Sequence, residues 1–120
     1  MLKTVEQKSR QRKAKLTQEL KSITNQLIEL YSPEKIILFG SLVNGESVHN
    51  NSDIDLFIIK QNVPKKRGYR TYELDKLIDY SLAVDFIVYT PEEVSKRLEI
   101  GDLFVTDIIN NGKLIYEQKA

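Results

Sequence analysis

Residues 39–59 read FGSLVNGESVHNNSDIDLFII and place a short polar loop between two apolar runs. The run at 35–39 (KIILF) and the run at 54–59 each have the length and composition of a buried strand. Gly40 ends the first run, and residues 41–45 fit one helical turn. Asp53 and Asp55 stand where the second run begins. Two carboxylates do not help a strand to bury itself, so this stretch indicates a candidate site as well as a strand–turn–strand unit.

The rest of the chain alternates between helical and strand patterns. Leucine and isoleucine recur at spacings of three and four between residues 16 and 30, which predicts an amphipathic helix. The expected elements are a helix at 5–31, strands at 35–39 and 54–59, a loop at 62–68, a helix with its apolar positions at 72–82, a strand at 83–89, a helix capped by Thr90, a last helix ending near 110–112, and a strand at 113–116. This order predicts an α/β (α+β) fold, a small mixed β-sheet flanked by helices.

Length and composition limit the classes of protein to consider. A chain of 120 residues with 41% hydrophobic and 29% charged residues fits one globular domain, residues 1–120. No apolar run approaches the roughly 20 residues needed to cross a bilayer, and we expect no signal peptide or membrane contact. The chain has no cysteine, which excludes disulfides and thiolate chemistry and fits a cytoplasmic protein.

The net charge of +1 hides an uneven distribution. Residues 1–21 contain seven basic and two acidic side chains, and a second basic cluster occupies residues 60–70. A helix over 5–31 would be about 40 Å long, longer than a domain of this size requires, so residues 1–15 are expected to form a basic, extended N-terminal part. Each cluster fits either a solvated surface or contact with phosphates or an acidic partner.

The paired aspartates suggest metal chemistry. Side chains two residues apart in a strand share a face about 6.6 Å apart, so Asp53 and Asp55 are expected to converge and to repel unless a cation lies between them. Asp85 interrupts the apolar run AVDFIVY at 83–89 and would add a third carboxylate if the two strands are neighbours. Three carboxylates on adjacent strands are what a two-metal magnesium site requires.

The turn at Gly40-Ser41 provides the complementary half of such a site. A strand that runs into glycine, serine and a helical turn presents backbone N–H groups and a hydroxyl that bind phosphate. Taken alone, the turn is also typical of a simple chain reversal. The D-x-D pattern alone is also typical of a solvated strand end. Together they favour nucleotidyl or phosphoryl transfer from a nucleoside triphosphate.

These residues resemble the signature of the minimal nucleotidyltransferases of the DNA polymerase β superfamily. That signature is Gly-Ser after a strand, a loop that contains a glycine, S-D-x-D at the next strand and a third aspartate on a later strand. Here the matching residues are Gly40, Ser41, Gly45, Asp53, Asp55 and Asp85, with eleven residues between Ser41 and Asp53. The resemblance extends over about residues 16–117 and implies a palm-like nucleotidyltransferase fold.

The resemblance also implies roles. Gly40 and Ser41 would hold the triphosphate of ATP, Asp53 and Asp55 would bind two Mg²⁺ ions, and Asp85 would complete one metal site and assist deprotonation of the acceptor. The expected reaction transfers AMP to a hydroxyl. Relatives of this length often form toxin–antitoxin pairs in which the transferase adds AMP to a tyrosine of a helical HEPN-type toxin, so such a partner is expected, and nucleic acid is not expected as a direct substrate.

Two other functions stay open at this level. The chain could be a non-catalytic module that neutralises a partner by binding, or it could modify a small molecule in the manner of aminoglycoside nucleotidyltransferases. A homo-oligomer is also compatible with the sequence. Among the remaining candidates, His49 fits a solvated loop residue, and Tyr69 and Tyr72 beside the second basic cluster fit either the rim of the core or stacking on a base.

Overall fold

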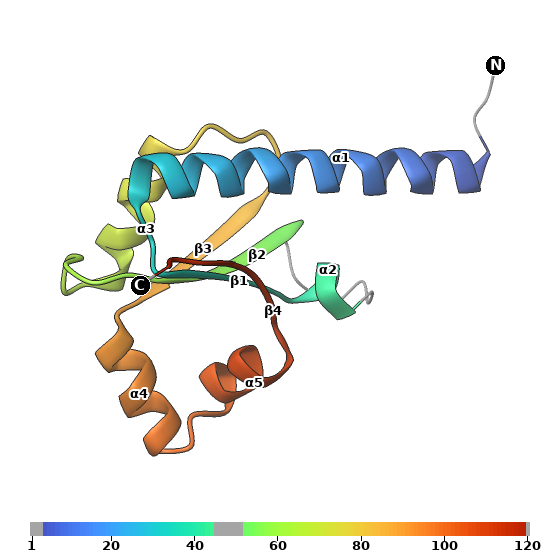
Figure 1. Ribbon diagram of the computed structural model, residues 1–120. Coiled ribbons are helices and arrows are strands. Elements are labelled where there is room, and N and C mark those ends of the chain that lie inside the picture. Colours follow the sequence, from blue (N-terminus) through green and yellow to red (C-terminus); the bar gives the residue numbers. More distant parts are fainter. Residues whose placement is uncertain (1–3, 45–51, 120) are drawn as a thin grey trace.

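A computed structural model describes residues 4–44 and 52–119 of the chain. One mixed sheet lies between helices, as the sequence predicts (Figure 1). In chain order the elements are α1 (Val5–Gln26), the π-helical turn η1 (Leu27–Tyr31), β1 (Lys35–Phe39), α2 (Ser41–Asn44), β2 (Ile54–Ile59), α3 (Arg67–Leu77), β3 (Val84–Tyr89), α4 (Pro91–Glu99), α5 (Leu103–Asn111) and β4 (Lys113–Glu117).

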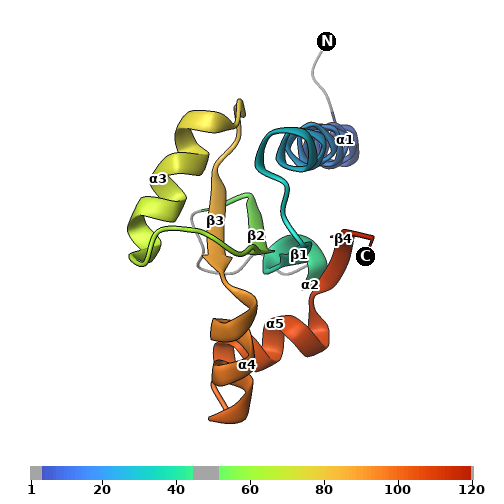
Figure 2. The same cartoon turned by 60° about the vertical axis from the view of Figure 1, so that its left-hand side comes forward.

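The strand order of the sheet is β3-β2-β1-β4. Strand β1 pairs antiparallel with both β2 and β4, whereas β2 and β3 run parallel. A parallel pair requires a crossover, and residues 60–83, which include α3, make it. Figures 1 and 2 show α1 and α3 over one face of the sheet and α4 and α5 over the other. All six residues of β2 are buried because helices cover both of its faces.

Helix α1 and its continuation η1 confirm the long helix predicted at 5–31. Thr4 and Gln7 form a capping box at its start, and Ser32 ends it in a left-handed conformation at φ 52° before Pro33. Within the described residues, neither α1 nor any other helix is both long and apolar enough to cross a membrane. Figure 1 shows the N-terminal half of α1 extending beyond the sheet on the side where α2 lies.

Helix α3 differs from its prediction at both ends. It begins at Arg67, inside the expected loop, and Ile78 leaves it in an extended conformation, so Leu82 is not helical. The apolar spacing predicted a helix that reaches Leu82, but the segment after Leu77 forms hydrogen bonds with α1 instead of continuing α3. Gln26 accepts a hydrogen bond from the Asp79 backbone N–H at 2.7 Å and donates one to the Asp79 carbonyl at 2.8 Å.

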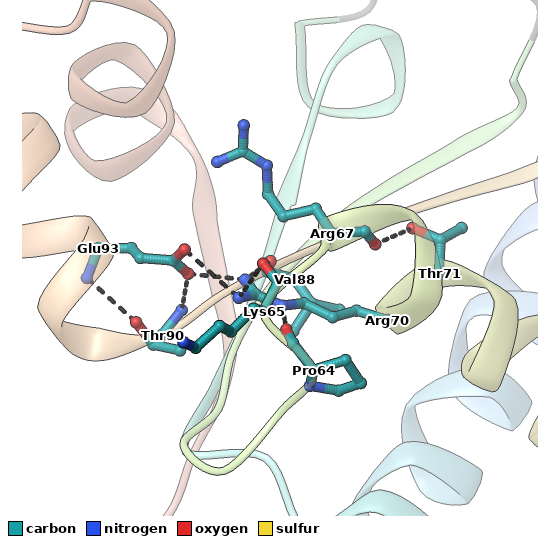
Figure 3. Close-up of polar contacts among 8 residues, drawn as sticks. All are labelled: Pro64, Lys65, Arg67, Arg70, Thr71, Val88, Thr90 and Glu93. Atoms are coloured by element: carbon teal, nitrogen blue, oxygen red, sulfur yellow. Dashed lines mark hydrogen bonds and ion pairs between the residues drawn. The ribbon is translucent and has the colours of Figure 1, made fainter.

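Arg70 corrects the interpretation of the second basic cluster. Its side chain is buried instead of facing phosphate or solvent, with 2% of the residue exposed. The guanidinium donates to the carbonyls of Pro64 at 2.5 Å and Val88 at 3.0 Å and forms an ion pair with Glu93 at 2.6 Å (Figure 3). Glu93 also completes the capping box of α4 with Thr90. Arg70 therefore joins the loop after β2, the end of β3 and the start of α4.

This network predicts a large loss of stability for Arg70→Ala. The substitution leaves buried carbonyls and one carboxylate without their donor, which costs about 3 kcal/mol of the free energy of unfolding. The matched control is Arg67→Ala, which removes the same charge from an exposed position one turn earlier in α3 and costs below about 1 kcal/mol. Urea denaturation of both variants measures the difference, and equal losses would show that the buried network contributes no special stability.

Candidate active site

The parallel pairing of β2 and β3 brings two of the predicted aspartates together. Asp55 is the direct neighbour of Asp85 in the register of the two strands. Neighbouring positions of a parallel pair present their side chains on the same face of the sheet. Asp55 is 2% exposed, whereas Asp85 lies near the start of the edge strand and is exposed. The expectation that β3 lies beside β2 and adds a carboxylate there is confirmed.

Gly40 lies directly against the Asp55 carboxylate. Phe39 pairs with Asp55 across β1 and β2, and Gly40 follows with φ at +80°. A Cβ atom at this position would overlap Asp55 Oδ2. Ser52 Oγ also donates a hydrogen bond to Asp55 Oδ1 at 2.6 Å. Only glycine permits both this backbone conformation and this close approach, so the turn and the carboxylate form one unit.

Asp53 has side-chain partners that the sequence did not predict. It precedes β2 and so is not bound by the alternation of a strand. Its Oδ1 accepts a hydrogen bond from Arg12 Nη2 of α1 at 2.7 Å, and its Oδ2 accepts one from the Ala83 backbone N–H at 3.2 Å. Asp53 therefore has a positively charged neighbour in Arg12, where the sequence predicts a metal ion between the two aspartates.

The surroundings of Asp85 destabilise the ionised form of its carboxyl group. Partial burial, then the negative charges of Asp55 and Asp75, raise the pKa of the Asp85 carboxyl above its ordinary value. Both causes act against the ionised form. A cation beside the Asp55–Asp85 pair would relieve the repulsion.

The carboxylates fit a magnesium site in their chemistry and only in part in their arrangement. Hard oxygen ligands in a partly buried, negatively charged position suit Mg²⁺. However, no group of three acidic or histidine side chains among residues 4–44 and 52–119 is arranged to hold a metal ion. Asp55 and Asp85 are neighbours in the register of β2 and β3, and Asp53 is bound to Arg12.

A cavity of about 340 Å³ adjoins Gly40, between the end of β1 and α5. Asp107 and Asn111 of α5 line it, and Asn111 Nδ2 donates to Asp107 Oδ1 at 2.7 Å. Its volume falls within the range of small-molecule sites. The sequence does not single out Asp107 and Asn111, because a spacing of four on a predicted helix is too common a pattern to identify a site.

The other predicted residues lie in several places. Ser41 begins α2 directly after Gly40. Gly45 and His49 lie outside the described residues. Tyr69 and Tyr72 are exposed on α3, which follows the opposite end of β2 from the aspartates, and they line a separate cavity with Lys66. Stacking of a base on these tyrosines stays one of the two alternatives that the sequence left open.

Comparisons with known proteins agree with this geometry. Residues 18–120 match the family model described as polymerase beta, nucleotidyltransferase. The chain belongs to this family. It is 33% identical over 88 residues to a Methanocaldococcus jannaschii protein named "Putative protein adenylyltransferase", a match that covers 69% of this chain and 58% of the relative. The fold resembles the crystal structure of "a putative nucleotidyltransferase from Sulfolobus solfataricus", with a TM-score of 0.58 at 19% identity over 89% of this chain and 87% of the other.

The nucleotidyltransferase family and fold predicted from the sequence are therefore confirmed. The chain spans less than two thirds of the length of the relative from Methanocaldococcus jannaschii. The roles of the individual site residues stay predictions.

The contact between Gly40 and Asp55 predicts that Gly40→Ala destabilises more than a matched change elsewhere. Gly101 has a similar φ of +74°, but a Cβ there would meet no atom within 4 Å. Gly101→Ala should therefore cost only the left-handed backbone penalty, about 1 kcal/mol. Gly40→Ala should cost clearly more, because the added methyl also displaces the carboxylate. Chemical denaturation of both variants measures the two losses of free energy of unfolding. Equal losses would show that the Asp55 side chain moves away from the added methyl group at no cost.

The burial and the charge repulsion that act on the Asp85 carboxylate predict that Asp85→Asn raises the melting temperature of the metal-free protein at neutral pH. The ionised carboxylate costs stability because its pKa is higher in the folded state than in the unfolded chain. Below the ordinary aspartate pKa of about 3.9 both states are protonated, so the gain should disappear there. Calorimetry at neutral and at acidic pH in chelator tests this, and a lower melting temperature at neutral pH would contradict it.

Proposed function

We propose that this protein is a magnesium-dependent nucleotidyltransferase that transfers AMP from ATP to a hydroxyl group of another protein. The observation that supports this most is the register that pairs Asp55 with Asp85 while Gly40 lies against Asp55. Membership of the polymerase β nucleotidyltransferase family supports the reaction class. The name of the relative from Methanocaldococcus jannaschii supports AMP as the transferred group and a protein as the acceptor.

In this proposal the residues have separate tasks. The backbone at Gly40 and Ser41 binds the triphosphate, and the cavity beside Gly40 receives part of the nucleotide. Asp53, Asp55 and Asp85 would hold the metal ions, which would neutralise charge on the phosphates. Asp85 also accepts the proton of the acceptor hydroxyl, because it is the exposed carboxylate of the three. The hydroxyl oxygen bonds to the α-phosphorus, the bond from that phosphorus to the bridging oxygen breaks, and pyrophosphate leaves.

The acceptor that we propose is a tyrosine of a helical HEPN-type toxin, and the protein would then act as its antitoxin. The support for this partner is the resemblance of Gly40-Ser41 and Ser52-Asp53-Ile54-Asp55 to the minimal nucleotidyltransferases. Asp85 is exposed at the edge of the sheet, where an acceptor from another molecule can approach it.

The test is AMP transfer to the partner. The protein is incubated with a HEPN-type protein encoded beside it, ATP and Mg²⁺, and intact-mass spectrometry should show the partner heavier by one AMP unit or a small multiple. Asp85→Asn should lower the rate at least about a hundredfold, because it removes the base and one metal ligand while it preserves side-chain volume. The control Asp79→Asn makes the same chemical change at an exposed position after α3 and should leave the rate unchanged.

The same experiment distinguishes catalysis from binding. If the partner gains no mass but loses its toxicity in the presence of both the parent and a triple Asp53→Ala, Asp55→Ala, Asp85→Asn variant, the protein is a binding module and not an enzyme. If AMP appears on a small-molecule hydroxyl and not on the partner, the reaction class holds and the proposed acceptor is wrong.

A further inference from the structure

The N-terminal half of α1 places positive charge beside the candidate active site. Residues 4–15 are all exposed, and they include five basic side chains and one acidic one, Glu6. Figure 1 shows this segment extending past the sheet on the side of α2, which follows Gly40. From this segment Arg12 reaches Asp53 and forms an ion pair at 2.7 Å.

The rotation of α1 about its axis aims Arg12 at this position. Arg12, Glu19 and Gln26 are seven residues apart, so they lie along one stripe of the helix. Glu19 accepts a hydrogen bond from the Ser81 backbone N–H at 2.5 Å, and Gln26 bonds to the backbone of Asp79. The stripe thus follows the segment before β3, and Ala83 at its end donates to Asp53. Two anchored positions on the same stripe therefore direct the third toward the aspartate.

The ion pair itself adds little to stability. The Arg12 side chain is 66% exposed and that of Asp53 is 25% exposed. Exposed ion pairs of this kind contribute at most about 1 kcal/mol. The guanidinium can therefore leave Asp53 at low cost, and it has the planar set of donors that binds carboxylate and phosphate oxygens alike.

We propose that Arg12 binds the triphosphate of the nucleotide and that Asp53 holds it in place until the nucleotide arrives. This rests on the proposed function. In the free protein Arg12 neutralises Asp53. When Asp53 binds a metal ion with the nucleotide, Arg12 is released from the carboxylate beside the phosphates and donates hydrogen bonds to them. Arg12 is thus a substrate-binding residue contributed by the basic segment of α1, outside the region that matches the family model.

The exchange predicts two opposite effects of one substitution. Arg12→Ala removes the cation that competes for Asp53, so the affinity for a metal ion alone should rise, by up to about fivefold for a pair of this exposure. The same substitution removes charge-assisted hydrogen bonds to phosphate, so the affinity for the metal–nucleotide complex should fall by about tenfold or more. A residue that only stabilised the fold would not move the two affinities in opposite directions.

The experiment is isothermal titration calorimetry on the full chain with two probes. The first is Mn²⁺ alone, and the second is α,β-methylene-ATP with Mg²⁺, in which the bond to be broken is inert. Arg12→Lys should keep part of the nucleotide affinity, because it keeps the charge without the planar fork. The matched control is Arg10→Ala, which removes an equal charge from the same exposed segment on a different side of α1 and should change neither affinity.

Three results would overturn the proposal. If Arg10→Ala weakens nucleotide binding as much as Arg12→Ala, the overall positive charge of the helix attracts the nucleotide and Arg12 has no specific role. If Arg12→Ala tightens Mn²⁺ binding but leaves nucleotide affinity unchanged, Arg12 only blocks the carboxylate. If the parent itself binds no metal–nucleotide complex at millimolar concentration, the proposed function fails and the role of Arg12 fails with it.

Discussion

The position of β2 between β1 and β3 is the constraint on which the rest of this structure depends. All six residues of β2 are buried, and its two neighbours run in opposite directions. The antiparallel neighbour brings the turn at Gly40 to the start of β2, and the parallel neighbour brings Asp85 to the same place. A shift of one residue in either register would turn an aspartate to the other face of the sheet. The apolar side chains of β2 therefore fix the place of the polar site.

The site is built at some cost to the stability of the fold. A buried carboxylate at Asp55, a neighbouring carboxylate with a raised pKa, and a glycine with positive φ are each less favourable than an apolar alternative. Stability is concentrated elsewhere, in the two apolar clusters on the faces of the sheet and in the buried Arg70 network beyond the opposite end of β2. The fold is thus stable at one end of the strands and carries unfavourable polar groups at the other end. A site for charged substrates requires such polar groups, held in place by a stable fold.

Helix α1 connects these two regions. Ile23 in its C-terminal part and Leu27 of the adjoining turn η1 pack into the core, which fixes the helix on the sheet. Its N-terminal part has no buried residue and is strongly basic. Because a helix is stiff over this length, the packing of the buried part determines where the exposed part lies, and Arg12 meets Asp53 as a result.

The sequence by itself determined the order of the elements, the mixed sheet, the family and the identity of the candidate residues, because these follow from local patterns. Hydrophobic spacing, the Thr90 cap and the strand breaks at Gly40 and Pro33 act within a few residues, so α1, β1, β2 and β3 could be predicted closely. The tertiary structure alone decided which charges meet. Arg70 looked like a surface cation and is buried, because carbonyls and a carboxylate from three distant segments converge on it. Asp53 was expected to share a metal ion with Asp55, and in the structure its carboxylate binds Arg12, 41 positions away. Which charged groups pair depends on their distances in space, and the sequence alone does not give the distances between residues that are far apart in the chain.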